Sequence, residues 1–393
     1  MGGSASPYKI NVNGLSTLES NDIDVEANDS IYVFVQVNID TSATNNPFIS
    51  RDSILINYNG NNRYVQLQAY GQNATYYKNK KITGNIVWTN QRPYVILGAL
   101  TIDTTATLTI NAGVKIYAHA DAPFVVHGTL KITGTKVSPV IFAGDRLDAD
   151  YKDLPAGWPG MIFLNTSKDN ALTFAIIKNA YQAIVVQNGS VNSNPKLTLS
   201  QCIITNSYDA GIFGINTSIQ ANNCLISNCG NNLLLTLGGN YNFTNCTVAG
   251  YSNFYINHLN PVLQLSNAAM QGGQTLISSL SANFKNSIFW GEGGPVEDEV
   301  IVQKAGNTSF NVTFDNCLYK ALHDPMNTTL NTVYKNVDPQ FDSINSNKQI
   351  YDFHFNNHPS SPAVDKGTAT IFPFDLDNRI RANNATDLGC YER

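Results

Sequence analysis

A short run of charged and aromatic residues stands out in a chain that otherwise carries few charges. Only 13% of the 393 residues are Asp, Glu, Lys or Arg, about half the usual share. The stretch 144–158 nevertheless holds four aspartates, two basic residues and two aromatic rings. Carboxylates bond sugar hydroxyls in pairs and a ring covers the apolar face of a sugar, so this mixture suits a neutral or Ca²⁺-bridged glycan. The predicted ligand-binding residues are Asp145, Asp148, Asp150, Tyr151, Asp153 and Trp158.

The same insertion also has a purely structural interpretation. Pro155 and Pro159 flank Gly157 and Trp158, and proline on both sides suits a rigid lid. Trp158 would then anchor the lid on the flank of the fold, and the charges would only be solvated. If the insertion binds a ligand, Trp158→Ala and Asp148→Ala should each weaken binding without unfolding the protein, whereas a lid leaves binding unchanged.

The middle of the chain lacks the residues that catalysis on polysaccharides requires. Between Leu197 and Asn283 there is one Asp, Asp209, one His, His258, and no Glu, Lys or Arg. A hydrolase needs two carboxylates as acid and base, and a lyase needs a basic side chain that removes a proton. We therefore assign no catalytic residue. An active site would have to come from the insertions or from the ends of the chain.

Two groups of residues raise the question of metal binding. No Cys pair lies near a matching His pair, so the spacing of a zinc site is missing, and we assign no metal ligand. The C-terminal carboxylates could hold Ca²⁺ through their oxygens, but we favour a cap in which they accept backbone N–H bonds and Arg379 pairs with one of them. No other cofactor is expected. These carboxylates are Asp365, Asp375, Asp377, Asp387 and Glu392.

The overall composition excludes several classes of protein. With 24 Lys and Arg against 29 Asp and Glu, the net charge is −5, and no basic patch indicates nucleic-acid binding. No run of 18 apolar residues predicts a transmembrane segment. Hydrophobic residues make up 42% of the chain, which is too many for a disordered protein. About fifty Asn favour β-structure with many tight turns.

The elements that would position these residues are β-strands throughout. Residues 8–82 contain short segments that alternate apolar and polar residues, such as 31–39 and 64–70. This period predicts strands with one buried face and, from their number, a small immunoglobulin-like β-sandwich. A binding module and a passive spacer both remain open for it, and we favour the spacer.

Residues 86–345 repeat with a period of about 22, the period of one coil of a right-handed parallel β-helix. The repeat aligns small residues at Cys202, Cys224, Cys246, Ala268, Ser287 and Cys317. Stacked coils place them in one interior column, where they would be free thiols and small fillers. The residues before them form a second column, which we interpret as an asparagine ladder at a turn. Its predicted members are Gln201, Asn223, Asn245, Asn267, Asn286 and Asn316.

Two parts of the chain resemble known proteins. The stretch 93–144, with Leu108-Thr-Ile110, Leu130-Lys-Ile132 and turn glycines, resembles the first coils of secreted bacterial β-helix proteins. Residues 361–367, 375–379 and 387–392 resemble the closing segment of choice-of-anchor β-helix surface proteins, although Cys390 replaces the usual Ala. The whole is similar to Bacteroidetes-type surface β-helix lipoproteins. The resemblance implies export to the outer membrane, cell surface or periplasm and allows a lipid anchor on a segment preceding this sequence.

Taken together, these features predict an all-β protein with three parts. They are the sandwich at 8–82, the β-helix at 86–345 and a C-terminal capping segment at 346–393. The function we expect is non-catalytic carbohydrate binding or adhesion at a bacterial surface, with a glycan or polysaccharide as partner. A polysaccharide lyase or glycoside hydrolase acting on acidic polysaccharide is the first alternative, and a structural spacer is the second.

Overall fold

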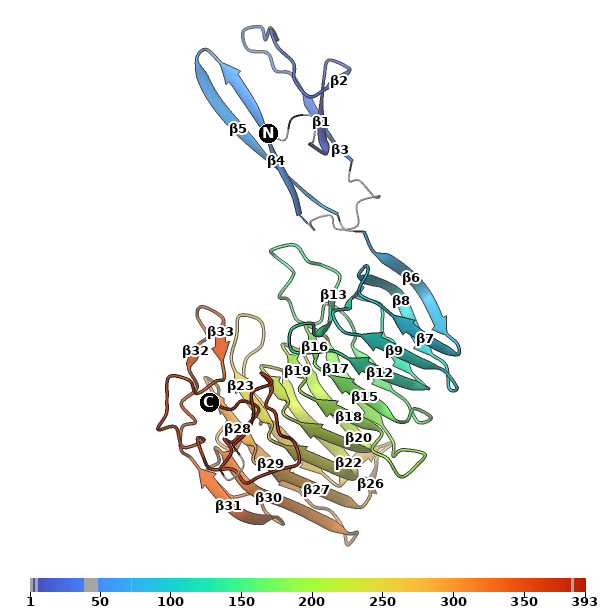
Figure 1. Ribbon diagram of the computed structural model, residues 1–393, viewed down its shortest axis with the longest axis vertical. Helices are drawn as coiled ribbons and strands as arrows, with labels where there is room; N and C mark the ends of the chain where they lie inside the picture. Colours follow the sequence, from blue (N-terminus) through green and yellow to red (C-terminus); the bar gives the residue numbers. More distant parts are fainter. Residues whose placement is uncertain (1–2, 4–5, 39–48, 72, 383–384) are drawn as a thin grey trace. The chain divides into compact units, whose positions relative to one another are not determined.

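The computed structural model describes residues 3, 6–38, 49–71, 73–382 and 385–393. The chain divides into two compact units, Met1–Thr75 and Tyr76–Arg393. Both are built from strands (Figure 1), and no helix of the described residues is long and apolar enough to span a membrane. The all-β prediction is confirmed.

The first unit contains two small antiparallel sheets. One has the order β2-β1-β3 and the other is the β4–β5 hairpin. All five residues of β3 are exposed, with Phe34 at 68%, so the buried face expected from the alternation at 31–39 does not form there. The reason is that β3 pairs along one side with β1 and no second layer of described residues covers its side chains. The strands are β1 (Tyr8–Val12), β2 (Leu15–Thr17), β3 (Val33–Val37), β4 (Ile49–Tyr58) and β5 (Asn61–Tyr70).

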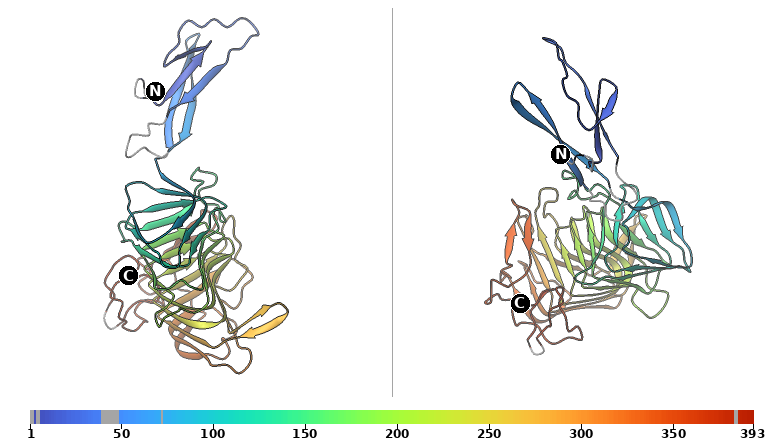
Figure 2. Two further views of the ribbon diagram at one scale, coloured as in Figure 1. Left: turned by 90° about the vertical axis from the view of Figure 1, so that its right-hand side faces the viewer. Right: turned by 45° about the horizontal axis from the view of Figure 1, so that its top comes forward.

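The second unit begins earlier than the sequence suggested. The strand β6 (Thr75–Ile82), which we had assigned to the sandwich, pairs with β8 (Tyr94–Ile102) in the large parallel sheet, and β7 (Asn85–Trp88) pairs with β9 (Thr107–Asn111). The stacked strands of this unit form a parallel β-helix (Figures 1 and 2). Its connections take the right-handed sense that parallel strands favour.

Three rows of parallel strands run along the β-helix. The first row contains β10 (Lys115–Ala118), β13 (Val140–Gly144), β16 (Ala175–Lys178), β19 (Ile203–Thr205), β21 (Leu225–Ser227), β23 (Thr247–Tyr251) and β28 (Ile288–Glu292). The second contains β11 (Phe124–Val126), β14 (Met161–Phe163), β17 (Gln182–Gln187), the first halves of β20 (Ala210–Asn222) and β22 (Asn231–Thr244), β24 (Leu263–Ser266) and β29 (Val300–Gln303). The third contains β9, β12 (Thr129–Thr133), β15 (Asn170–Thr173), β18 (Leu197–Ser200), the second halves of β20 and β22, β27 (Leu280–Lys285), and the first halves of β30 (Phe310–Tyr319) and β31 (Thr329–Lys335), whose second halves continue the first row after β28.

Alternation along each strand builds the core. Leu108, Leu130 and their neighbours two residues on are fully buried, while the residues between them point outward. Aromatic rings stack inside the first coils, and Trp88 and Tyr94 lie 4.2 Å apart with nearly parallel planes. Burial of these apolar side chains is the main stabilising term of the fold.

The small-residue column is confirmed for Cys202, Cys224, Cys246 and Cys317, all of which are fully buried. Ser287 follows Cys246 directly, since its hydroxyl accepts a hydrogen bond from the Cys246 N–H (3.1 Å). The prediction for Ala268 was wrong. Leu263–Ser266 copies the repeat motif but forms β24 in the second row, and Ala268 enters the antiparallel hairpin of β25 (Ala268–Gln271) and β26 (Gln274–Ile277), which projects from the coils (Figure 2, left). All six cysteines are free and buried, as expected.

The asparagine ladder is also largely confirmed. Its members have left-handed backbones, which asparagine tolerates better than most residues with a side chain, with φ of 53° at Gln201 and 49–52° at Asn223, Asn245, Asn286 and Asn316. The Asn286 amide donates to the Asn245 side-chain oxygen (3.0 Å). Asn267 is not a member, because it bonds Ala305 and Thr308 on another part of the coil.

The segment predicted as an end cap lies along a flank of the β-helix. Phe341, Phe353, Leu388 and Cys390 pack on the outer side chains of the first row, such as Trp290, and the red C-terminal chain lies beside β23 and β28 in Figure 1. Near its start, β32 (Ser343–Asn345) and β33 (Ile350–Asp352) form a hairpin. The C-terminal segment thereby buries apolar side chains on the outer face of the first row, which would otherwise be exposed to solvent.

Candidate functional site

The insertion 144–158 leaves the first row after β13 and folds back on itself. Arg146 holds Asp148 through two bonds of 2.9 Å and lies 3.8 Å over the ring of Tyr151. The Arg146 guanidinium therefore keeps the pKa of the Asp148 carboxyl below its usual value. Asp145 accepts a bond from the His119 ring (2.7 Å), which raises the pKa of that imidazole. Two of the four aspartates, Asp145 and Asp148, therefore already have a hydrogen-bonded basic partner.

A second asparagine ladder fastens the other half of the insertion. The Asn179 amide donates to the Lys152 carbonyl (2.7 Å), and the Asn206 amide donates to the Asp153 carbonyl (2.8 Å). The side chains of Asp150 and Asp153 remain exposed. They stay candidates for ligand binding.

The prediction for Trp158 as a stacking surface is wrong. Its ring is only 1% exposed and lies 6.2 Å from Phe142 inside the coil. Its indole N–H donates to the Lys178 carbonyl (3.0 Å), and its backbone pairs with Ala180 as the first residue of the next turn. A buried ring offers no face to a sugar. Trp158 instead anchors the insertion on the coil, as the lid interpretation predicts.

An exposed aromatic surface does occur immediately beside this anchor. Tyr181 and Tyr208 lie on adjacent coils, 47% and 55% exposed, with ring centroids 5.8 Å apart and planes at 25°. The Asp209 N–H donates to the Tyr181 carbonyl (2.8 Å), and the Tyr181 N–H donates to the Trp158 carbonyl (2.7 Å). The backbone of the coils therefore fixes the two rings as one platform.

A chain of polar side chains borders the platform. The Gln182 amide donates to the Asp209 carboxylate (2.6 Å), the Asn231 amide to the Asp209 carbonyl (3.0 Å), and the Gln264 amide to the Asn231 side-chain oxygen (2.7 Å). Gln182 and Asn231 are the first residues of β17 and β22, Asp209 directly precedes β20, and Gln264 is the second residue of β24. They offer both donors and acceptors at the edge of the aromatic surface.

Outward side chains of the second row continue this surface. The register aligns Ile162 with Val185, Phe213, Leu234 and then Gln264, and the residues on either side of each are buried in the core, so these side chains point away from the core. Val185 is nevertheless buried, at 5% exposure, and the other four are partly exposed. We call the surface formed by Tyr181, Tyr208, Gln182, Asp209, Asn231, Gln264 and this outward column the tyrosine face.

The tyrosines that follow the turn asparagines differ in exposure. Tyr208 is 55% and Tyr255 43% exposed, whereas Tyr251 is buried at 7% under the C-terminal segment. Tyr181 was missed. A signal for it existed, because Tyr181 follows Asn179 by two residues in the same way that Tyr208 follows Asn206.

The other charged clusters are structural. Arg381, and not the predicted Arg379, forms the buried ion pair of the C-terminal segment, with Glu392 (3.0 Å). Asp375 and Asp387 accept backbone N–H bonds, as predicted, at 2.6–2.8 Å. No group of three His, Cys, Asp or Glu among the described residues is placed to hold a metal ion. The pair of His258 and Glu299 (2.8 Å) lies in the interior, 5% and 0% exposed.

Comparison with known proteins gives one match. Residues 80–183 match the family described as pectate-lyase like beta helix domain. The matched part runs from β6 into β17 and includes both the insertion and Tyr181. The comparisons with curated proteins and with solved structures found no match. The family match indicates a polysaccharide-related protein and leaves binding and catalysis as alternatives.

Proposed function

We propose that this protein binds carbohydrate without cleaving it, and that the tyrosine face is its binding surface. The observation that carries the proposal is the stacked pair of Tyr181 and Tyr208, both about half exposed. The two rings stack on each other and remain about half exposed to solvent, and backbone hydrogen bonds between the coils fix their positions. Sugar rings have apolar faces that pack on such aromatic surfaces.

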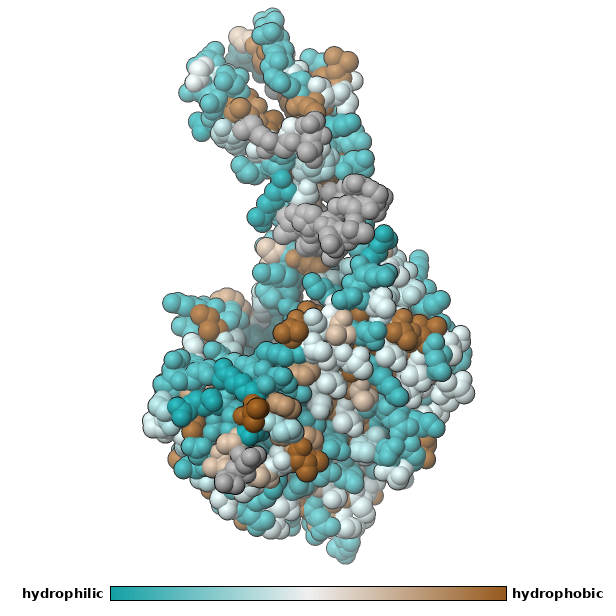
Figure 3. Space-filling view, in the orientation of Figure 1, coloured by the Kyte–Doolittle hydropathy of each residue, from teal (hydrophilic) through white to brown (hydrophobic). Residues whose placement is uncertain are grey.

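The polar border supplies the hydrogen bonds that carbohydrate recognition needs. Gln182, Asn231 and Gln264 are held in place by bonds to one another and to Asp209, so little entropy is lost when they bind hydroxyl groups. In Figure 3 the visible face of the second unit is mostly hydrophilic or neutral, with isolated apolar side chains. An aromatic platform bordered by amides that donate and accept hydrogen bonds suits a glycan chain.

The charge distribution supports binding over catalysis. Asp209 is the single acid on the tyrosine face, and its carboxylate already accepts a bond from Gln182. A hydrolase would need a second carboxylate at a defined distance. In the insertion, Asp145 and Asp148 are already paired with His119 and Arg146. Display on a bacterial surface, as an adhesion or glycan-capture protein, remains part of this proposal through the resemblance of the C-terminal segment.

A glycan array combined with activity assays tests the proposal. We expect the purified chain to bind at least one polysaccharide. We also expect it to release neither unsaturated uronates nor new reducing ends from acidic polysaccharides, with or without Ca²⁺. Sustained turnover that survives further purification would show an enzyme instead. Failure to bind any glycan on a broad array would favour the structural spacer.

A further inference from the structure

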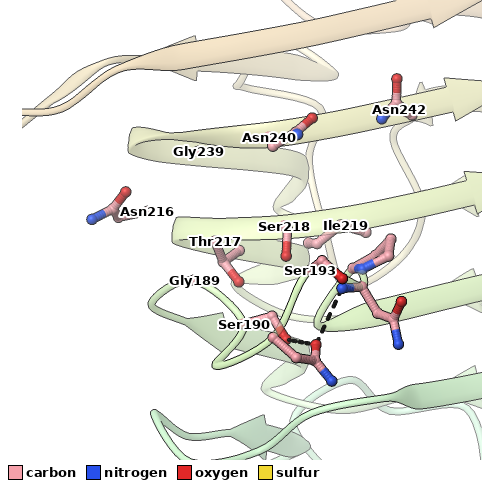
Figure 4. Close-up of a pocket in the computed structure, with 13 residues that line it drawn as sticks. Gly189, Ser190, Ser193, Asn216, Thr217, Ser218, Ile219, Gly239, Asn240 and Asn242 are labelled. Carbon is pink, nitrogen blue, oxygen red and sulfur yellow. Dashed lines mark hydrogen bonds between the residues drawn. The ribbon is translucent and has the colours of Figure 1, made fainter.

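A hollow on a different side of the coil has the chemistry of a second sugar site. The loop 188–196 connects β17 to β18 and stands over the third row, where it encloses a pocket of about 450 Å³ with the corners of β20 and β22 (Figure 4). This volume lies in the range of small-molecule sites.

The lining of the pocket is polar and uncharged. Amide and hydroxyl side chains dominate it, and the apolar lining comes from Pro195 and Ile219. None of the lining residues is acidic, basic or aromatic. Amides and hydroxyls donate and accept hydrogen bonds equally well, which matches a polyhydroxylated neutral ligand. The polar side chains that the argument uses are Ser190, Asn216, Thr217, Ser218, Asn240 and Asn242.

The loop that covers the pocket is fixed by charged groups which do not themselves face it. Asp169 accepts bonds from Asn194 (2.7 Å) and Asn192 (3.0 Å), and these bonds lower the pKa of the Asp169 carboxyl. The Lys196 ammonium is buried and donates to the carbonyls of Leu164, Asn165 and Gln187 at 2.7–3.2 Å. Burial lowers its pKa to about 8. The Lys196 ammonium therefore already has three hydrogen-bond acceptors, and it does not line the pocket.

Thr217 provides an independent indication of a ligand. It lines the pocket, is only 1% exposed, and its hydroxyl has no hydrogen-bond partner among the described residues. Figure 4 shows the hydroxyl on the side that faces the loop of Ser190. A buried hydroxyl without a partner is less stable than one that is hydrogen-bonded, so a ligand that supplies the missing bond would bind there favourably. The strand is irregular at this position, with a register shift between Ile215 and Thr217 and a left-handed backbone at Asn216. This irregular backbone sets the position of Thr217.

We propose that this pocket binds one uncharged sugar residue, such as the end of a neutral glycan, and excludes uronic acids. A sugar hydroxyl would complete the bonding of Thr217, while the amides of Asn240 and Asn242 would bond its neighbours. A uronate carboxylate would find no cation on the lining to offset the loss of its hydration. The inference rests on the proposed function only for the class of ligand, because the site is separate from the tyrosine face.

The test uses the full chain with galactose, N-acetylglucosamine and galacturonate as separate probes, followed by amide chemical shifts in an NMR titration. We expect at least one neutral sugar to shift residues 189–195 and 216–219, and galacturonate to leave them unchanged. Thr217→Val removes the hydroxyl at nearly constant volume, and should weaken binding about tenfold while raising the melting temperature. Thr217→Ser should keep the binding.

Control variants separate this site from the tyrosine face. Asn283→Ala changes an outward residue that aligns with Asn242 on the next coil but lies outside the pocket, and should bind the sugar as wild type does. The same holds for Tyr181→Ala with Tyr208→Ala, even if that variant loses polysaccharide binding. Equal binding of galacturonate, unchanged affinity in both Thr217→Val and Asn240→Ala, or no shift with either neutral sugar would overturn the inference.

Discussion

Trp158→Ala is expected to lower the free energy of unfolding by about 3–5 kcal/mol. The substitution removes a ring that is 1% exposed, leaves a cavity beside Phe142, and deprives the Lys178 carbonyl of the indole N–H. The overlying loop fills little of that space, because Asn179 and Asn206 hold its backbone. Chemical denaturation followed by far-ultraviolet circular dichroism measures the loss.

Two variants control the interpretation of that experiment. Trp158→Phe keeps most of the volume and loses only the indole bond, so it should be destabilised by less than half as much. Tyr151→Ala removes an exposed aromatic ring of the same insertion and should cost under about 0.5 kcal/mol. A denaturation curve for Trp158→Ala that coincides with the wild-type curve would show that Trp158 does not anchor the insertion.

Arg381→Met is expected to cost a similar amount, about 3–5 kcal/mol, by leaving Glu392 buried without its partner. The Arg381 guanidinium is 4% exposed and bonds Glu392, Asn223 and the Gly389 carbonyl at 2.8–3.0 Å. It therefore links the C-terminal segment to the asparagine ladder. We expect the loss to appear as local release of residues 346–393, measured by hydrogen exchange of their amides.

Matched substitutions test whether the ion pair is responsible. Arg379→Met removes bonds from a guanidinium that reaches Asn356 and the Glu392 carbonyl at the surface, and should cost less. Adding Glu392→Gln to Arg381→Met removes the unpaired charge and should recover part of the loss. Slow amide exchange across the C-terminal segment in Arg381→Met would contradict this account of how the segment is attached.

Sequence periodicity was sufficient to predict the coils where the repeat has no gaps. Cys202, Cys224 and Cys246 are each 22 residues apart, and their spacing alone placed them in one column. The prediction failed at Ala268 because Leu263–Ser266 has the repeat's apolar pattern in a different row. Local pattern identifies a strand, whereas the length of the preceding loop decides which row the strand joins.

The functional surfaces were harder to predict because they combine residues from several coils. Trp158 looked exposed in a charged insertion, but it is the first residue of the next coil and points inward. Tyr181 is not part of a charged run in the sequence, so nothing there marked it as a binding residue. It becomes part of a binding surface only because Tyr208 of the adjacent coil stacks on it. The pocket at Thr217 depends on a loop and two strand corners, which no spacing rule connects.

The central claim, that the tyrosine face binds carbohydrate, is tested most directly by one affinity measurement. Isothermal titration calorimetry would compare the wild type, Tyr181→Ala with Tyr208→Ala, and Tyr151→Ala, all with the polysaccharide bound best on the glycan array. The account predicts that loss of both platform rings weakens binding by about a hundredfold without changing the melting temperature by more than a few degrees, while Tyr151→Ala binds as wild type does. Wild-type affinity in the double variant would contradict the claim and place the binding surface elsewhere.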